Sequence, residues 1–288
     1  MSSLQNFRTR ITSVKSTHKV TSAMKMVAAS KLRRAQAAAE TSRPYSDRLA
    51  LMLAAAARDL DIDDFRPPLL YGSGADRTHL LVVVTSDKGL CGGFNANLIR
   101  FAKEEMRRLV ADGKTVTLLA VGRKGREALQ ADHKRDILHE VMFPGGALDF
   151  SFAEDIADWI LTRFDEGAFD ICSLVFSRFH SVLSQEPEIH RILPFDLPEA
   201  QHGALSFDFE PNQRALVEAL LPRNFRVQLY QSILESVAGE HAARMNAMDS
   251  ATRNAEEMLD DLTLSYNRAR QASITSDLIE IISGAEAL

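Results

Sequence analysis

The residues best suited to nucleotide chemistry form one short stretch, 86–94, which reads SDKGLCGGF. It follows an apolar run at 80–85 and leads into a helical pattern, where α/β proteins often bind a phosphate group. This position favours a nucleotide-binding enzyme, such as an oxidoreductase or a kinase. The glycine spacing, however, fits neither G-x-G-x-x-G nor G-x-x-x-x-G-K-[ST], and no acidic residue closes the second predicted strand at Val121. Glycine-rich turns often only connect two elements, so the enzyme stays an alternative hypothesis.

Cys91, within this stretch, has two interpretations. A thiol at the start of a helix can be an activated thiolate, but a buried structural thiol is more common. The only other cysteine, Cys172, is distant in sequence, so the two predict neither a disulfide framework nor a metal knuckle. This cysteine usage fits a reducing compartment.

No pattern elsewhere indicates a metal site. The histidines lack ligand spacing such as H-x-x-x-H with a nearby carboxylate. A run of aspartates lacks the glycine and the terminal glutamate of an EF-hand loop and is typical of a solvated linker. We therefore expect no metal and no cofactor. The residues considered are His133, His139, His180, His190, Asp59, Asp61, Asp63 and Asp64.

The middle of the chain alternates between two kinds of pattern. Short apolar or β-branched runs predict strands, and amphipathic segments between the first three predict helices. Such alternation indicates a mostly parallel sheet covered by helices, and we predict a central Rossmann-like α/β domain at 76–212 after a linker at 59–76. The predicted strands are 80–85, 116–121, 171–176 and 189–195, and the predicted helices are 94–110, 123–131 and 152–164.

The two ends of the chain predict long helices. The first proline is Pro44 and the first glycine is Gly72, so the opening segment lacks strong helix breakers. Steps of three and four residues from Leu4 trace a heptad seam, the row of positions that would face a partner helix, and eight of its eleven members are apolar. We assign 1–58 to an N-terminal coiled-coil helix. The seam is Leu4, Phe7, Ile11, Val14, His18, Thr21, Lys25, Ala28, Leu32, Ala35 and Ala39.

The C-terminal segment has the same character, with no proline after Pro222. A helix from about 223 to 283 would be on the order of 90 Å long at about 1.5 Å per residue, too long to stay within a domain of this size. We assign 213–288 to a C-terminal coiled-coil helix. Its predicted seam is Val227, Tyr230, Leu234, Val237, His241, Arg244, Met248, Ala251, Ala255, Met258, Leu262, Ser265, Ala269 and Ala272.

Charge and side-chain size indicate that these two helices pair with each other. Residues 1–43 carry nine basic side chains against one acidic one, whereas 223–288 carry six basic and ten acidic ones. Both seams are rich in alanine, which lets helix axes approach but buries little area, so a further partner must supply burial. A nucleic-acid arm or a transit peptide explains the basic start less well, because its charges surround the helix and the heptads continue without a cleavage break. The longest apolar runs, 49–57 and 80–84, fall far short of the roughly 20 residues that cross a bilayer.

Three segments resemble one family, the gamma subunit of F-type ATP synthase, along essentially the whole chain. Residues 21–36 (TSAMKMVAASKLRRAQ) resemble its N-terminal helix, 86–95 its glycine-rich turn, and 274–287 (ITSDLIEIISGAEA) its C-terminal signature. One position departs, because Asp277 stands where the family usually has glutamate. The cysteine insertion of chloroplast members is absent, so no redox switch of that kind is expected.

This resemblance implies a long antiparallel coiled coil of the N- and C-terminal helices beside the α/β domain, turning as a central rotor shaft. The shaft would be a non-catalytic subunit that couples proton flow through a membrane ring to ATP synthesis or hydrolysis in a hexamer of alpha and beta subunits. It would be peripheral, on the cytoplasmic face of the bacterial inner membrane, with the mitochondrial matrix face as the alternative. The implied contacts with the hexamer are Met24, Lys25, Arg270, Gln271 and Leu288, and the implied foot near the epsilon subunit and the membrane ring is Phe207, Asp208, Phe209 and Glu210.

Overall fold

The computed structural model describes residues 2–58, 65–145, 148–195 and 212–286. It divides into two compact units, which we call the helix unit (residues 1–29 and 244–288) and the α/β unit (residues 30–243). Two helices, α1 (Ser2–Arg58) and α6 (Gln213–Glu286), each contribute to both units. The long terminal helices predicted from the sequence are thus confirmed.

The α/β unit is built on one five-stranded sheet, in the order β3-β2-β1-β4-β5. Strands β1 to β4 run parallel to one another, and β5 pairs antiparallel with β4. This confirms the mostly parallel sheet. The edge strand β3 was not predicted, because its residues are at best half-buried and carry His139 and Glu140. The strands are β1 (Thr78–Val84), β2 (Thr115–Val121), β3 (Ile137–Val141), β4 (Ile171–Phe179) and β5 (Gln185–Leu193).

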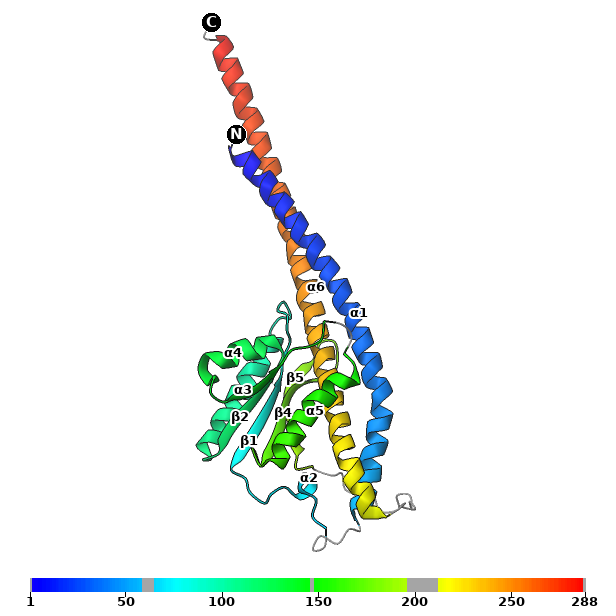
Figure 1. The fold of residues 1–288 in the computed structure, drawn as a ribbon. Helices are drawn as coiled ribbons and strands as arrows, with labels where there is room; N and C mark the ends of the chain where they lie inside the picture. The colour runs from blue at the N-terminus through cyan, green and yellow to red at the C-terminus, as the bar shows by residue number, and fades with distance from the viewer. Residues whose placement is uncertain (1, 59–64, 146–147, 196–211, 287–288) are drawn as a thin grey trace. The chain divides into compact units, whose positions relative to one another are not determined.

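Helices cover both faces of this sheet (Figure 1). On one face, α3 (Phe94–Ala111) and α4 (Arg123–His133) pack against β1 and β2 through residues such as Leu98 and Leu129. On the other face, α5 (Phe150–Asp165) and the first turns of α6 share one apolar core with the end of α1. A short helix, α2 (Pro68–Tyr71), lies in the segment predicted to be a linker.

Each long helix continues through a proline, Pro44 in α1 and Pro222 in α6. A proline inside a helix removes one hydrogen bond and costs about 3 kcal/mol. Around Pro222 this cost is offset by burial, since Leu221 and Phe225 are almost fully buried in the core. The helix begins at Gln213, where the segment assigned to it from the sequence begins, and ten residues before the position of about 223 from which its length was estimated.

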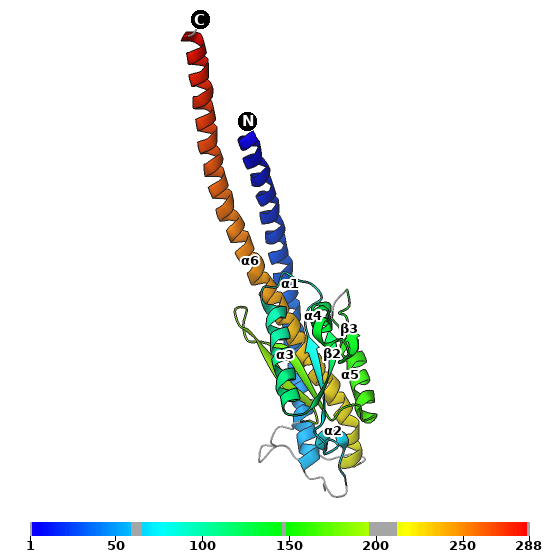
Figure 2. The same ribbon diagram turned by 90° about the vertical axis from the view of Figure 1, so that its left-hand side faces the viewer.

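In the helix unit, α1 and α6 lie side by side and run in opposite directions (Figure 2). The seam predicted for α1 is observed: Leu4, Phe7, Ile11, Val14 and His18 are half-buried between exposed neighbours. Lys25 is the exception, with 46 % of its side chain exposed.

The seam predicted for α6 is wrong at alternate positions in this unit. Met258 and Ser265 are exposed, and the next residues, Leu259 and Tyr266, are half-buried in their place. Ala255 and Leu262 are buried as predicted. A heptad seam alternates steps of three and four residues, and the sequence does not fix which step comes first. The observed order places Leu259 and Tyr266 in the seam in place of Met258 and Ser265, which buries more apolar area.

Among the described residues, none of the helices combines the length and the apolar character needed to cross a membrane.

Candidate functional site

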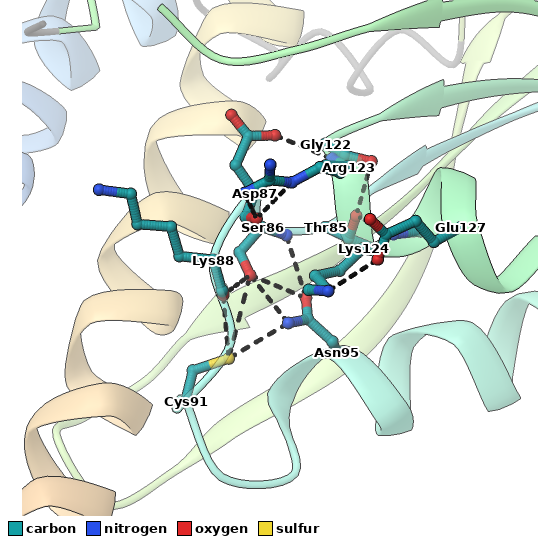
Figure 3. Close-up of polar contacts among 11 residues, drawn as sticks. Thr85, Ser86, Asp87, Lys88, Cys91, Asn95, Gly122, Arg123, Lys124 and Glu127 are labelled. Atoms are coloured by element: carbon teal, nitrogen blue, oxygen red, sulfur yellow. Dashed lines mark hydrogen bonds and ion pairs between the residues drawn. The ribbon is translucent and has the colours of Figure 1, made fainter. Parts of the chain in front are cut away.

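The glycine-rich turn after β1 is held by its own side chains (Figure 3). Asn95 accepts a hydrogen bond from the backbone N–H of Ser86 at 3.0 Å and donates from Nδ2 to the Ser86 hydroxyl at 2.8 Å and to the Cys91 sulfur at 3.2 Å. Cys91 is only 2 % exposed, and Leu90 takes a left-handed φ of 62°. The buried, hydrogen-bonded thiol agrees with a structural rather than a reactive cysteine.

The N-terminus of α4 is capped from the same turn (Figure 3). The carboxylate of Asp87 accepts from the N–H of Arg123 at 2.8 Å, the carbonyl of Ser86 from Lys124 at 3.0 Å, and the hydroxyl of Thr85 from Gly125 at 2.8 Å. Free N–H groups at a helix N-terminus are what usually bind a phosphate. Here these three N–H groups are already bonded within the protein.

Two glycines permit this close approach. A Cβ on Gly122 would lie 2.4 Å from the carbonyl oxygen of Thr85, and one on Gly125 would lie 2.7 Å from the Thr85 hydroxyl. Gly122 also has a φ of 95°, which favours glycine. The turns after β1 and β2 are therefore packed directly on each other.

The crevice where open α/β sheets bind ligands is also filled. The strand order reverses between β1 and β4, and such a switch point is the usual ligand site. Here α6 packs against it: Ser236 accepts from the backbone N–H of Ser177 at 3.4 Å, and a Cβ on Gly239 would lie 3.1 Å from the Ser177 hydroxyl and 3.5 Å from the Phe94 ring. This packing argues against the alternative of a nucleotide-binding enzyme.

Among the described residues, no group of three or more His, Cys, Asp or Glu side chains is placed to hold a metal ion. The aspartates at 59–64 lie outside the described residues.

Several polar contacts between described residues join the helices of the helix unit. Lys25 forms an ion pair with Asp249 at 2.5 Å, the hydroxyl of Thr252 donates to that of Thr21 at 2.8 Å, and Arg8 donates to the Tyr266 hydroxyl from two nitrogens. The hydrogen bond from Lys25 lowers the pKa of Asp249, and the charge of Arg253 acts in the same direction. The Lys25–Asp249 pair agrees with the charge complementarity predicted from the sequence.

The residues that the family resemblance assigned to the hexamer differ in their surroundings. Met24 is half-buried, and Lys25 forms an ion pair with Asp249. Arg270 and Gln271 are exposed on α6, and within the described residues neither side chain has a hydrogen-bond or ion-pair partner. Leu288, Phe207, Asp208, Phe209 and Glu210 lie outside the described residues.

The helix unit exposes many large apolar side chains. Most lie beyond Leu262 on α6, where no described residue is buried. Sequence reasoning missed them as a group because it searched for a single seam, although the spacing of isoleucine and leucine after Ile274 is visible in the sequence. Large exposed apolar surface indicates a partner. The residues are Val20, Met26, Val27, Met258, Leu264, Ile274, Leu278, Ile279, Ile281 and Ile282.

Comparison with known proteins gives one family. The sequence profile described as ATP synthase matches residues 3–288. The chain is 52 % identical over 296 residues to the ATP synthase gamma chain of Acidiphilium cryptum and 49 % identical over 298 residues to that of Rhizobium etli, with both chains covered completely in each case. Among solved structures, it is similar to a chain of the central stalk and c-ring of the Tetrahymena thermophila mitochondrial ATP synthase, with a TM-score of 0.61, 26 % identity and coverage of 81 % of this chain and 99 % of that one. The chain therefore belongs to the family of ATP synthase gamma chains.

Proposed function

We propose that the chain is the central rotor shaft of a proton-translocating F-type ATP synthase. The observation that carries this proposal is the helix unit: two antiparallel helices whose outer surface exposes a row of large apolar side chains at the end of α6. Such a surface needs a surrounding partner, and a hexamer of alpha and beta subunits supplies one. The chain itself is a non-catalytic subunit.

The remaining partners follow from family membership. The epsilon subunit and the membrane ring would bind the foot, which includes Phe207, Asp208, Phe209 and Glu210. The chain would then be a peripheral subunit at the cytoplasmic face of a bacterial inner membrane, and the bacterial origin of the two relatives described above favours this over the mitochondrial matrix face.

The shaft acts by biasing its partner. Rotation of the ring turns the shaft, and the shaft presents different residues to each beta subunit in turn. A bistable subunit changes its nucleotide affinity only if it gains different contact energy in different rotary positions. We propose that Met24, Lys25, Arg270, Gln271 and Leu288 make such position-dependent contacts.

Arg270 and Gln271 provide the sharpest test. A guanidinium offers five fixed donors and an amide both donates and accepts, so together they can hold a carboxylate and a backbone group. A hydrogen bond to a charged group contributes about 1.5 to 3 kcal/mol, enough to change the populations of rotary states about tenfold or more. The double substitution Arg270→Ala, Gln271→Ala is therefore expected to lower ATP turnover by the assembled complex without preventing assembly.

The matched control for the charge of Arg270 is Arg268→Ala, which removes the same charge from an exposed position two residues earlier, nearly opposite Arg270 around the helix. It should leave turnover close to that of the unsubstituted complex. Unchanged ATP hydrolysis and unchanged proton pumping in vesicles carrying the double variant would refute the proposed role.

A further inference from the structure

Two hydrogen bonds join the side chains of Arg8 on α1 and Tyr266 on α6. The Nε and Nη2 atoms of Arg8 both donate to the Tyr266 hydroxyl, at 3.0 and 2.9 Å. The guanidinium carbon lies 5.6 Å from the centre of the Tyr266 ring, beyond the hydroxyl at the edge of the ring. Two nitrogens of one arginine thus hold the hydroxyl at the outer end of the tyrosine side chain.

This contact lies near the start of α1, where the pairing of the two helices ends. In the helix unit, residue 8 faces residue 266, 21 faces 252 and 25 faces 249, which is a steady antiparallel register. Extending that register by one turn sets Arg270 opposite Leu4, close to the start of α1 at Ser2. Among the described residues, Arg8 and Tyr266 therefore make the last polar contact before α6 continues without α1 beside it.

Tyr266 and Arg270 are also coupled along α6. They are four residues apart in one continuous helix, so their side chains share a face and the orientation of one turn sets that of the next. After Leu262 no described side chain of α6 is more than half-buried, and a helix with little tertiary packing frays readily. Arg8 therefore adds a polar restraint to the turn before Arg270, beside the half-buried Ala269.

We propose that Arg8 is a positioning residue of the shaft: by holding Tyr266, it sets the direction in which Arg270 meets a beta subunit. This inference rests on the proposed function of Arg270. Arg8 acts through Tyr266 and is not itself a contact with the hexamer. Loss of the Tyr266 hydroxyl should then act on turnover only while Arg270 is present.

The test is a mutant cycle in the assembled complex. Tyr266→Phe removes only the hydroxyl, and Arg8→Ala removes its partner from an exposed position. Each is expected to lower ATP turnover at saturating ATP by roughly threefold to tenfold, the effect of one ordinary hydrogen bond at an exposed site, with unchanged assembly. In an Arg270→Ala background, neither substitution should lower turnover further.

Thr252→Val is the matched control, because it removes a different hydroxyl that bonds across the same two helices. A general loosening of the pair would make Thr252→Val as harmful as Tyr266→Phe, and that result would overturn the inference. So would additive effects of Tyr266→Phe and Arg270→Ala, or unchanged turnover in Tyr266→Phe and Arg8→Ala while Arg270→Ala lowers it. Unchanged turnover in Arg270→Ala itself would overturn the proposed contact and this inference with it.

A second measurement checks the positioning directly on the free chain. Hydrogen exchange of the backbone at 263–275 should accelerate in Arg8→Ala and stay unchanged in Thr252→Val. Equal exchange in the unsubstituted chain and in Arg8→Ala would overturn the inference, whatever the turnover of the complex.

Discussion

The carboxylate of Asp87 accepts a hydrogen bond from the backbone N–H of Arg123 at 2.8 Å, across the turns that follow β1 and β2. Its second oxygen accepts from the N–H of Phe143 at 3.1 Å. An anion of the protein thus occupies the start of α4, where the free N–H groups of a helix N-terminus could otherwise bind an external anion. The α/β unit thus has the strand and helix order of many nucleotide-binding folds, but the start of its second βα helix is closed by the protein's own carboxylate.

The first prediction follows from this arrangement. Calorimetric titration of the chain with ATP and with NADH should give no binding heat, because the glycine spacing of the turn before α3 fits no phosphate-binding loop and the N–H groups at the start of α4 are bonded to Asp87, Ser86 and Thr85. Micromolar affinity at the turn 89–93 would contradict the assignment of the chain as a shaft without a nucleotide site.

The second prediction concerns Gly125. A Cβ there would lie 2.7 and 2.8 Å from the hydroxyl and methyl groups of Thr85, so Gly125→Ala forces the two turns apart. We expect a loss of about 1 to 3 kcal/mol in the free energy of unfolding, as in other overpacked sites. Urea unfolding of the isolated chain measures it. Gly145→Ala is the control, since a Cβ at Gly145 meets no atom within 4 Å; equal stability of the two variants would show that the turns are not in tight contact.

The third prediction concerns pH and Glu235 in α6. Burial raises the pKa of this carboxyl above its usual range, although Arg178 and Arg43, at 4.0 and 3.9 Å, and His180 oppose the shift, while the charge of Glu188 adds to it. A carboxyl with a raised pKa in the folded state binds its proton more tightly there than in the unfolded chain. Stability therefore falls as the pH rises from the unfolded value, about 4.3, through the folded one.

Glu235→Gln removes this ionisation. The variant should be more stable than the unsubstituted chain at pH 7, and the difference should shrink as the pH falls toward 4. Urea unfolding across that range measures it. Glu188→Gln removes the same charge from a more exposed carboxylate, paired with Arg178 at 2.7 Å, and should give no such gain. A Glu235→Gln variant that is less stable at pH 7 would show that the two arginines outweigh burial.

The fourth prediction compares two parts of one helix. In the helix unit, α1 buries few side chains completely, Thr21 and Ala28 among them, whereas Leu53, Ala56 and Ala57 at its other end lie in the core of the α/β unit. Local opening is easier where little apolar area is buried. In the isolated chain, amides at 4–20 should exchange much faster than those at 49–57. Equal protection would mean that the helix pair is stable without its hexamer.

Sequence patterns predicted those elements whose burial is strong and periodic. The runs that became β1, β2 and β4 are almost wholly buried, so their composition is unmistakable. Strand β3 was not predicted because it lies at the edge of the sheet, where packing is weaker. Its exposed residues Leu138 and Glu140 alternate with residues that are only half-buried. The seam of α1 was also predictable, because its apolar residues recur at a regular spacing over many helical turns.

Single contacts between distant residues were not predictable. The phase of α6 depends on whether Met258 or Leu259 faces α1, and both are apolar, so only the packing of the pair decides. The Arg8–Tyr266 contact joins residues 258 positions apart, and neither has a local motif. The fit of Gly125 against Thr85 also required coordinates, because a glycine near a turn has many possible causes.

The burial of both cysteines has a practical consequence for single-molecule work. Cys91 is 2 % exposed and Cys172 is fully buried, where burial raises the pKa of its thiol and so suppresses the reactive thiolate. These are the only two cysteines in the chain. A cysteine introduced at Leu183, which is 87 % exposed in the turn between β4 and β5, would react with a maleimide dye far faster than either native thiol, so a fluorophore can be attached there without first replacing the native residues.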